Sequence, residues 1–266
     1  MNPPHLFARW HQVAPEIAAA DSLALFSDFD GTLVPIRRDP RIVSMAKLTQ
    51  RLLADFAASG HVVGIVSGRA LDDVKRRVAV PGLWYAGVHG FYICDPEHTK
   101  RCFLTRVDRA HVAKIAGQLQ ALLRGVSGVI VERKVAAVAV HYRGARLSGR
   151  HAAKHAVLSV VNRQRGLRIL PGDKVWEVMP AVPIDKSAAV RYILQRERPH
   201  ASRRRRLAIY LGDDVADERV FGGWQGISVA VGRRRPTNAR FSLRSPEEVR
   251  IFLKKLLKLH TYSVRF

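Results

Sequence analysis

The sequence predicts an α/β fold, in which a Rossmann-like core of parallel strands carries a smaller inserted α+β domain. In the first and last parts of the chain, short apolar runs alternate with amphipathic stretches of helical spacing, as in strand–helix–strand units. Polar or acidic residues directly follow several of these runs, at the strand ends where parallel sheets bind ligands. The middle of the chain instead pairs strand-like runs and flanks them with helical stretches, which is typical of an antiparallel unit.

The first part of the chain supplies three predicted strands and two predicted helices. The first strand ends just before Asp28, and Gly60 ends the first helix, because its freedom at positive φ suits a helix terminus. In chain order these elements are the strand 23–26, the helix 47–59, the strand 61–66, the helix 70–78 and the strand 83–86.

The remaining elements divide into an insert and a return to the core. We expect the core to comprise residues 1–103 and 183–266, and the inserted α+β domain residues 104–182. The insert is predicted to contain helices at 107–123 and 149–165 and strands at 129–132, 136–141, 167–170 and 175–178. The core then resumes with a helix that begins near Ser187 and strands at 207–211 and 227–231.

The composition is that of an ordinary globular protein. The chain has 266 residues, of which 47% are hydrophobic and 25% charged. It has no apolar run of about 18 residues, so we expect no membrane span. The N-terminus lacks the basic start and apolar core of a secretory signal, and Cys94 and Cys102 alone make no disulfide framework. We therefore expect a cytoplasmic protein, with a monomer favoured.

The formal net charge of +23 would attract polyanions and phosphorylated small molecules alike. The basic residues are spread along the chain, which favours solvated basic faces. The arginine run 203–206 directly precedes a predicted buried strand and has no interleaved aromatic residues on which bases could stack. We therefore expect no nucleic-acid partner, and this class of function remains the remote alternative.

The segment 28–32, with the sequence DFDGT, carries the strongest chemical signal. Asp28 and Asp30 lie two positions apart after an apolar strand, so their carboxylates point to the same side of the chain. Carboxylates held close together repel and need a cation or a shared proton. Mg²⁺ prefers such oxygen ligands, in company with phosphate oxygens. One carboxylate can then attack phosphorus while the other transfers protons.

Three further segments supply partners for these carboxylates. Asp213 and Asp214 follow a predicted buried strand, with Asp217 close behind, although acids also suit a helix N-terminus. Ser67 ends another strand, where its hydroxyl could hold a phosphate oxygen or simply cap a helix. Lys186 opens a helix, where a lysine is unfavourable unless an anion compensates it, although exposed lysines are common. Together these residue types fit phosphoryl transfer.

In this order, the four segments resemble the haloacid dehalogenase phosphatase superfamily. The resemblance implies a core of that type and an aspartyl-phosphate formed on Asp28, with Asp30 as acid and base. Ser67, Gly68 and Lys186 would bind the phosphoryl group. Asp28, the Asp30 carbonyl and Asp213 would hold Mg²⁺, with Asp214 and Asp217 supporting them.

Further segments are similar to the trehalose-6-phosphate phosphatase family over nearly the whole chain. They include 66–69 (VSGR), 86–90 (AGVHG), 131–134 (VERK), 140–143 (VHYR), 176–178 (WEV) and 212–218 (GDDVADE). In that family the insert is a mobile cap that closes on the sugar. The resemblance then implies substrate contacts by Arg69, His89, Gly90, Glu132, Lys134 and Glu177.

The leading hypothesis is therefore Mg²⁺-dependent hydrolysis of trehalose 6-phosphate through an aspartyl-phosphate, a reaction of trehalose biosynthesis. The chain departs from the family at Tyr92, where an acid is usual, and at Met179, where an arginine is frequent. Both departures lie in the expected sugar site, and neither touches the phosphoryl chemistry. A phosphatase for another sugar or sugar-like phosphate is the close alternative. A catalytically silent regulator is disfavoured because every phosphoryl-transfer position holds a competent residue.

Overall fold

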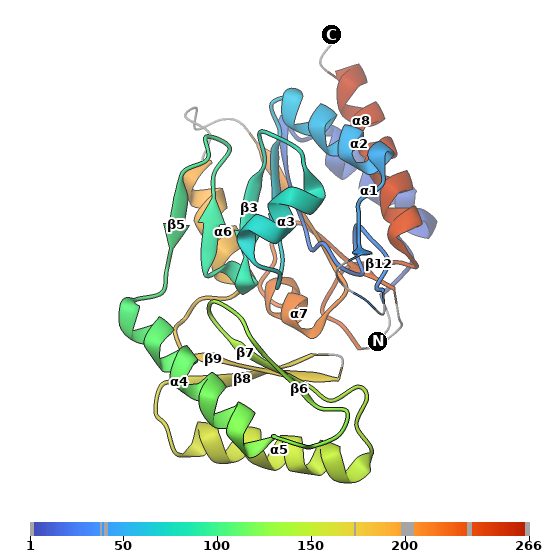
Figure 1. Cartoon of the computed structure of the whole chain (residues 1–266). Coiled ribbons are helices and arrows are strands. Elements are labelled where there is room, and N and C mark those ends of the chain that lie inside the picture. Colours follow the sequence, from blue (N-terminus) through green and yellow to red (C-terminus); the bar gives the residue numbers. More distant parts are fainter. Residues whose placement is uncertain are drawn as a thin grey trace. The chain divides into compact units, whose positions relative to one another are not determined.

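The computed structural model of the chain describes residues 3–37, 39, 42–172, 174–197, 205–232 and 236–263. The chain divides into two compact units, of which the larger comprises Met1–Arg101 with Asp185–Phe266 and the smaller Cys102–Ile184 (Figure 1). The larger unit thus ends and resumes two residues from the predicted positions 103 and 183. Arg203 and Arg204 of the arginine run lie outside the described residues.

The larger unit is built on a mixed sheet. Among the described residues this sheet has eight strands in the order β12-β11-β10-β1-β2-β3-β4-β5. Neighbours from β12 to β3 run parallel, and β4 runs antiparallel to β3. The strands are β1 (Ser22–Ser27), β2 (Val62–Val66), β3 (Trp84–Gly87), β4 (Tyr92–Cys94), β5 (Lys100–Cys102), β10 (Arg206–Gly212), β11 (Ile227–Val231) and β12 (Phe241–Leu243).

Helices cover both faces of this sheet. On β10, Ile209 and Leu211 join a core shared with α1, α2, α3 and α8. Because side chains alternate along a strand, Tyr210 points to the other face, where it reaches α7, and α6 packs against α7, β2 and β3. The helices are α1 (Trp10–Ala18), α2 (Lys47–Ala58), α3 (Leu71–Val78), α6 (Lys186–Arg196), α7 (Val215–Phe221) and α8 (Pro246–Ser263), with short 3₁₀ turns η1 (Leu6–Arg9) and η3 (Val88–Gly90).

Both ends of the insert start from neighbouring elements of the larger unit. The chain leaves this unit at Arg101 of β5 and re-enters it at Asp185, whose carboxylate caps α6 by accepting the Ala188 N–H at 2.9 Å. The Arg101 guanidinium lies over the ring of Tyr192 on α6, 5.5 Å from its centroid. The last strand before the insert and the first helix after it are therefore in direct contact.

The smaller unit is an antiparallel sheet backed by two helices. In the described residues its strand order is β6-β7-β9-β8. Val138, Val140 and Val178 on one face of this sheet form an apolar core with α4 and α5. The elements are α4 (Arg106–Leu122), β6 (Ile130–Arg133), β7 (Val138–His141), α5 (Leu147–Asn162), β8 (Leu167–Gly172) and β9 (Val175–Pro180).

The predicted α/β fold with an inserted α+β domain is confirmed. Every strand and helix predicted from periodicity is present, with ends that differ by a few residues. Not predicted from the sequence were α1, α7, α8, β12 and the β4–β5 pair. None of the helices in the described part of the chain combines the length and the apolar character that a membrane span requires.

Candidate active site

Asp28 lies at the carboxyl end of β1, in the middle of the sheet. Its backbone N–H donates to the Leu211 carbonyl of β10 at 2.9 Å, which fixes the strand end. Its Oδ1 accepts the Phe29 N–H at 2.6 Å, and the residue is only 5% exposed. Gly31 follows at φ +80°, and a Cβ there would lie 2.0 Å from the carboxylate of Asp213. The Asp-Gly turn therefore requires glycine for both conformation and space.

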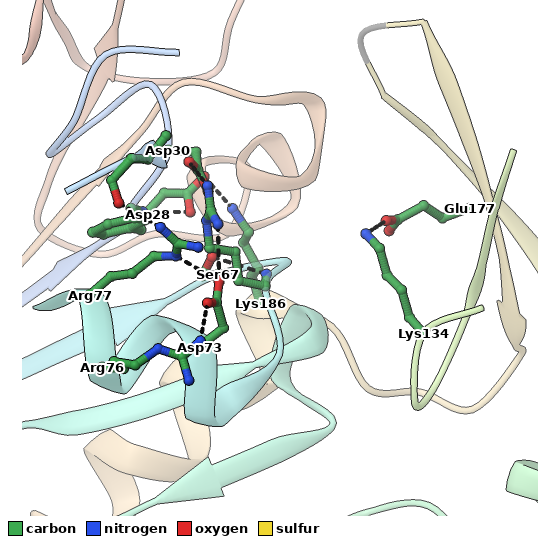
Figure 2. A network of polar contacts seen from close by, with 12 residues as sticks. Asp28, Asp30, Ser67, Asp73, Arg76, Arg77, Lys134, Glu177 and Lys186 are labelled. Carbon is green, nitrogen blue, oxygen red and sulfur yellow. Dashed lines mark hydrogen bonds and ion pairs between the residues drawn. The ribbon is translucent and has the colours of Figure 1, made fainter. Parts of the chain in front are cut away.

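Lys186 is the first residue of α6 and is buried, with 2% exposure. Its Nζ lies 2.7 Å from Asp28 Oδ2 (Figure 2). The same Nζ donates to Asp217 Oδ1 at 2.8 Å. Burial alone would lower the pKa of this lysine, but the charges and hydrogen bonds of Asp217 and Asp28 outweigh it and raise the pKa. Lys186 is therefore a fixed cation paired with Asp28. The alternative that it is an exposed surface lysine is excluded.

Asp217 is fully buried on α7 and organises the loop after β10. It accepts the N–H groups of Asp213 at 3.0 Å and Asp214 at 2.9 Å, and the Tyr210 hydroxyl at 2.7 Å. Asp214 caps α7 by accepting the Val215 N–H, so it also serves the helix N-terminus, as the sequence allowed. Sequence reasoning missed Tyr210, whose phenol inside an otherwise apolar strand was the available signal.

Asp28, Asp213 and Asp217 form a group of carboxylates suited to a metal ion. One oxygen from each lies within 4.8 Å of the others. Burial raises the pKa of Asp28 well above its usual range despite the attraction of Lys186, and the other two carboxylates raise it further. Burial and the Asp217 charge likewise raise the pKa of Asp213 to about 7. When ionised, the three carboxylates carry two more negative charges than the one lysine balances, so the charge of the cluster fits a divalent cation.

The Asp30 carboxylate pairs with Arg69. Arg69 Nε donates to Asp30 Oδ2 at 2.6 Å and its Nη2 to Oδ1 at 2.7 Å, which is a bidentate ion pair. Arg69 Nη1 donates to Asp73 Oδ2 at 3.0 Å. Arg69 was predicted to contact the substrate, and in this structure these donors are directed at two carboxylates. Asp73 is not among the site residues predicted from the sequence.

Ser67 is buried at the end of β2, beside β1 in the parallel sheet. Its hydroxyl accepts the Arg69 N–H at 3.1 Å, and its carbonyl accepts the His89 N–H at 2.9 Å. A Cβ on Gly68 would lie 2.7 Å from the His89 ring, so only glycine fits there. Val88 and His89 both have positive φ, near 50° and 56°, which is strained for Val88 and is frequent at functional sites. Gly90 closes this turn, so 67–69 and 88–90 form one connected corner.

The predicted residues of the insert share one face of its sheet. Glu132 of β6 and Glu177 of β9 are both in register with Ala139 of β7, so both carboxylates lie on one face of the sheet. This face is opposite the one that packs against α4 and α5. Lys134 Nζ donates to the Glu177 carboxylate (Figure 2), and His141 Nε2 lies 2.9 Å from Glu132 Oε2. The hydrogen bond from His141 lowers the pKa of Glu132. Sequence reasoning did not single out His141.

The structure therefore places the predicted site residues in two groups. In the larger unit, the ends of β1, β2 and β10 and the start of α6 bring together carboxylates, a lysine and a buried serine. In the smaller unit, two glutamates and a lysine lie on the helix-free face of the sheet. The first group has the parts for phosphoryl transfer, and the second has planar carboxylates and an ammonium donor, which can bind hydroxyl groups.

Comparison with known proteins agrees with this arrangement. A sequence model described as trehalose-phosphatase matches residues 26–246. A trehalose-phosphate phosphatase of Mycobacterium bovis is 36% identical over 242 residues, which are 88% of this chain and 61% of the relative. One of Mycobacterium ulcerans is 36% identical over 245 residues, with the same coverage. The chain thus spans about three fifths of the length of these relatives.

A solved structure has the same fold. The C-terminal domain of the Candida albicans trehalose-6-phosphate phosphatase superposes with a TM-score of 0.82 at 20% identity, over 97% of this chain and 98% of that domain. At this identity the likeness concerns the fold alone. The match of the family model extends from β1 to the start of α8 and thus includes both groups of site residues. The resemblance read from the sequence motifs is confirmed, and the chain belongs to the trehalose-phosphatase family.

Proposed function

We propose that the protein hydrolyses trehalose 6-phosphate to trehalose and phosphate through a phosphorylated Asp28. The observation that carries this proposal is the buried Asp28 carboxylate, paired with Lys186 in a chain of the trehalose-phosphatase family. Lys186 holds one oxygen of Asp28 and the Phe29 N–H the other, so the carboxylate is fixed at the end of β1. Such a pre-oriented nucleophile is what an in-line attack on phosphorus needs.

The reaction has two displacements. In the first, an Asp28 oxygen forms a bond to phosphorus while the bond to the sugar oxygen breaks, and Asp30 donates a proton to the departing alkoxide. In the second, Asp30 takes a proton from water as the water oxygen attacks phosphorus, which releases phosphate and restores Asp28. Lys186 and Ser67 balance and bind the negative oxygens of the transferring group.

A divalent cation, with Mg²⁺ the best match to an all-oxygen donor set, would be held by Asp28 and Asp213, with the backbone carbonyl of Asp30. When bound, it neutralises charge on the phosphoryl oxygens and on the carboxylates. Asp217 accepts hydrogen bonds from Lys186, Tyr210 and two backbone N–H groups. It therefore positions the loop around the cation and is not itself a ligand.

The helix-free face of the inserted sheet supplies sugar recognition in this proposal. Carboxylates and a lysine can pair with vicinal hydroxyls, and closure of a cap over the sugar excludes water from the phosphorylated intermediate. A second candidate is a phosphatase for another sugar phosphate, favoured by the chain's departures from the family. Met179 is completely buried on β9, where a family arginine would be charged, and Tyr92 is half-buried.

A phosphate-release screen with trehalose 6-phosphate, glucose 6-phosphate and other sugar phosphates tests the proposal. We expect the highest kcat/KM for trehalose 6-phosphate. A higher kcat/KM for another sugar phosphate would identify that compound as the preferred substrate and would leave the proposed chemistry unchanged. No release above the level of an Asp28→Asn variant from any of them would reject the phosphatase assignment.

Removal of divalent cations is expected to abolish turnover, and Mg²⁺ is expected to restore it. Stability gives a second measurement. The folded-state pKa of Asp213, about 7, lies above its unfolded value near 4, so its contribution to stability is lost as pH rises from about 4 to 7. The thermal unfolding midpoint of the metal-free protein should therefore fall as pH rises over this range, and Mg²⁺ should make this fall smaller. Asp213→Asn should lack the Mg²⁺-dependent shift. Full activity in excess EDTA would refute the metal assignment.

Replacing Glu177 with Gln is expected to lower kcat/KM for trehalose 6-phosphate by about 10- to 100-fold, the usual effect of losing a charged hydrogen-bond partner. Hydrolysis of a small phosphate ester without sugar hydroxyls, such as p-nitrophenyl phosphate, should change by less than about threefold. Asp108→Asn, a carboxylate of the same unit that caps α4, is the control with the same change in charge. An equal loss for both substrates would show that Glu177 does not act through the sugar.

A further inference from the structure

The carboxylate of Asp73, in the first turn of α3, accepts hydrogen bonds from three arginine side chains. Its Oδ2 accepts Arg77 Nε at 2.8 Å and its Oδ1 accepts Arg76 Nη2 at 2.7 Å (Figure 2). Its Oδ2 also accepts Arg69 Nη1 at 3.0 Å. Arg77 is itself fixed, because its Nη1 donates to the Val43 carbonyl at 2.6 Å. Asp73 is therefore the centre of a polar network that connects α3 to the loop after β2.

The three arginines differ in their surroundings. The side chain of Arg76 is 73% exposed and contributes little to a fixed geometry. The side chains of Arg69 and Arg77 are 12% and 15% exposed, and that of Asp73 is 22% exposed. Burial raises the pKa of Asp73, but the hydrogen bonds and charges of Arg77 and Arg69 outweigh it and lower the pKa to about 2. Asp73 is therefore a charged and well-held anchor at neutral pH.

Arg69 connects Asp73 to Asp30, the residue predicted to act as both acid and base. Its Nε and Nη2 form the bidentate pair with Asp30, and the guanidinium lies over the Phe29 ring, 5.5 Å from its centroid. A guanidinium is planar and its donors have fixed relative directions. Fixing Nη1 on Asp73 and one face on Phe29 therefore also fixes the two donors that hold Asp30.

We propose that Asp73 is a positioning residue for the phosphoryl-transfer reaction, which acts through Arg69 to hold the Asp30 carboxylate in one orientation. This inference rests on the proposed function, in which Asp30 transfers the protons. It assigns Arg69 a different role from the substrate contact expected from the resemblance, because the donors that a sugar would need are directed at Asp30 and Asp73.

The neighbouring residue Asp72 separates this role from ordinary helix capping. Both acids lie in the first turn of α3, where either one favours the helix dipole. Asp72 is 75% exposed on its side chain and pairs with Lys100 at 2.7 Å. A benefit to α3 alone would be common to the two acids, whereas the connection to Asp30 belongs to Asp73.

The test compares Asp73→Ala with Asp72→Ala, using whichever sugar phosphate the wild-type protein hydrolyses. We expect Asp73→Ala to lower kcat by about 10- to 100-fold, as misorientation of a reacting group does, with KM changed by less than about threefold. Asp72→Ala should stay within about twofold of wild type. If Asp73→Ala fails to fold, Asp73→Asn, which keeps an acceptor, should show a smaller loss of kcat in the same direction.

A double-variant cycle identifies the path of the effect. In an Arg69→Met background, Asp73→Ala should lower kcat by less than about twofold, because the connection is already broken. The proposal would be overturned if the losses of kcat in Asp73→Ala and Arg69→Met multiplied in the double variant. It would also be overturned if the kcat of Asp73→Ala equalled that of the wild type.

A spectroscopic measurement keeps this test independent of the substrate. We expect the Arg69 Nε–H resonance, assigned with Arg69→Met, to be protected from solvent exchange in the wild type. The protection should be lost in Asp73→Ala and kept in Asp72→Ala. Its persistence in Asp73→Ala would reject the positioning role whether or not the protein hydrolyses trehalose 6-phosphate. Absence of sugar-phosphate hydrolysis by the wild type, with the protection lost as expected, would instead reject the proposed function.

Discussion

Replacing Asp28 with Asn is expected to reduce phosphate release by a factor on the order of 10⁴ or more, because an amide cannot form the phosphorylated intermediate. The fold should persist. Lys186 keeps its ion pair with Asp217, and removing one of the three clustered carboxylates relieves repulsion that raises the pKa of Asp28 itself. The thermal midpoint without metal should therefore stay within a few degrees of that of the wild type, or rise.

Mass spectrometry of the protein after brief incubation with substrate gives the direct measurement. The wild type should carry a transient phosphoryl group on the peptide that contains Asp28, and Asp28→Asn should carry none. Asp55→Asn, on the exposed side of α2, is the control for the loss of one aspartate. Turnover by Asp28→Asn within tenfold of that of the wild type would exclude Asp28 as the nucleophile.

The second large effect is expected for Lys186→Met, which preserves much of the side-chain length but removes the charge. Asp28 and Asp217 both lose their buried cation. Breaking a buried ion pair from one side typically lowers stability by about 3–5 kcal/mol. Phosphate release should fall by about 10²- to 10³-fold or more, because the charge of the transferring group is no longer balanced.

Denaturant unfolding with and without Mg²⁺ measures this effect. A divalent cation supplies positive charge to the same carboxylates, so Mg²⁺ should stabilise Lys186→Met more than it stabilises the wild type. Lys254→Met, at an exposed position of α8, is the control and should behave as the wild type does. Unchanged stability of Lys186→Met in the absence of metal would contradict the burial and pairing on which both expectations rest.

Local patterns were sufficient to predict the framework of the core and the placement of its acidic residues. Asp28, Ser67 and Asp213 each follow an apolar run, and adjacent parallel strands bring such ends to one edge of a sheet. Helix α8 was not predicted, although Val249, Phe252 and Leu253 recur at helical spacing and make it predictable. Strand β12, with three residues, is too short for its periodicity to stand out.

The connections between these residues could not be predicted in the same way. The hydrogen bond between Tyr210 and Asp217 joins a strand to the following helix, and the apolar pattern only indicates that Tyr210 is buried. Arg69 precedes the first turn of α3, so its spacing of four from Asp73 does not by itself imply a contact, and no spacing indicates its pair with Asp30. These contacts depend on tertiary packing, which selects one rotamer among several that the local sequence allows.

The contact between Arg101 and Tyr192 has a consequence for exchange of the insert. The points where the chain leaves and re-enters the larger unit are joined by residues of that unit, and the re-entry at Asp185 leads directly into the helix that begins with Lys186. A segment inserted between these points would join a unit in which the cluster of Asp28, Lys186 and Asp213 is already assembled. Exchange of the whole segment between these two points would therefore change the smaller unit without disturbing this cluster.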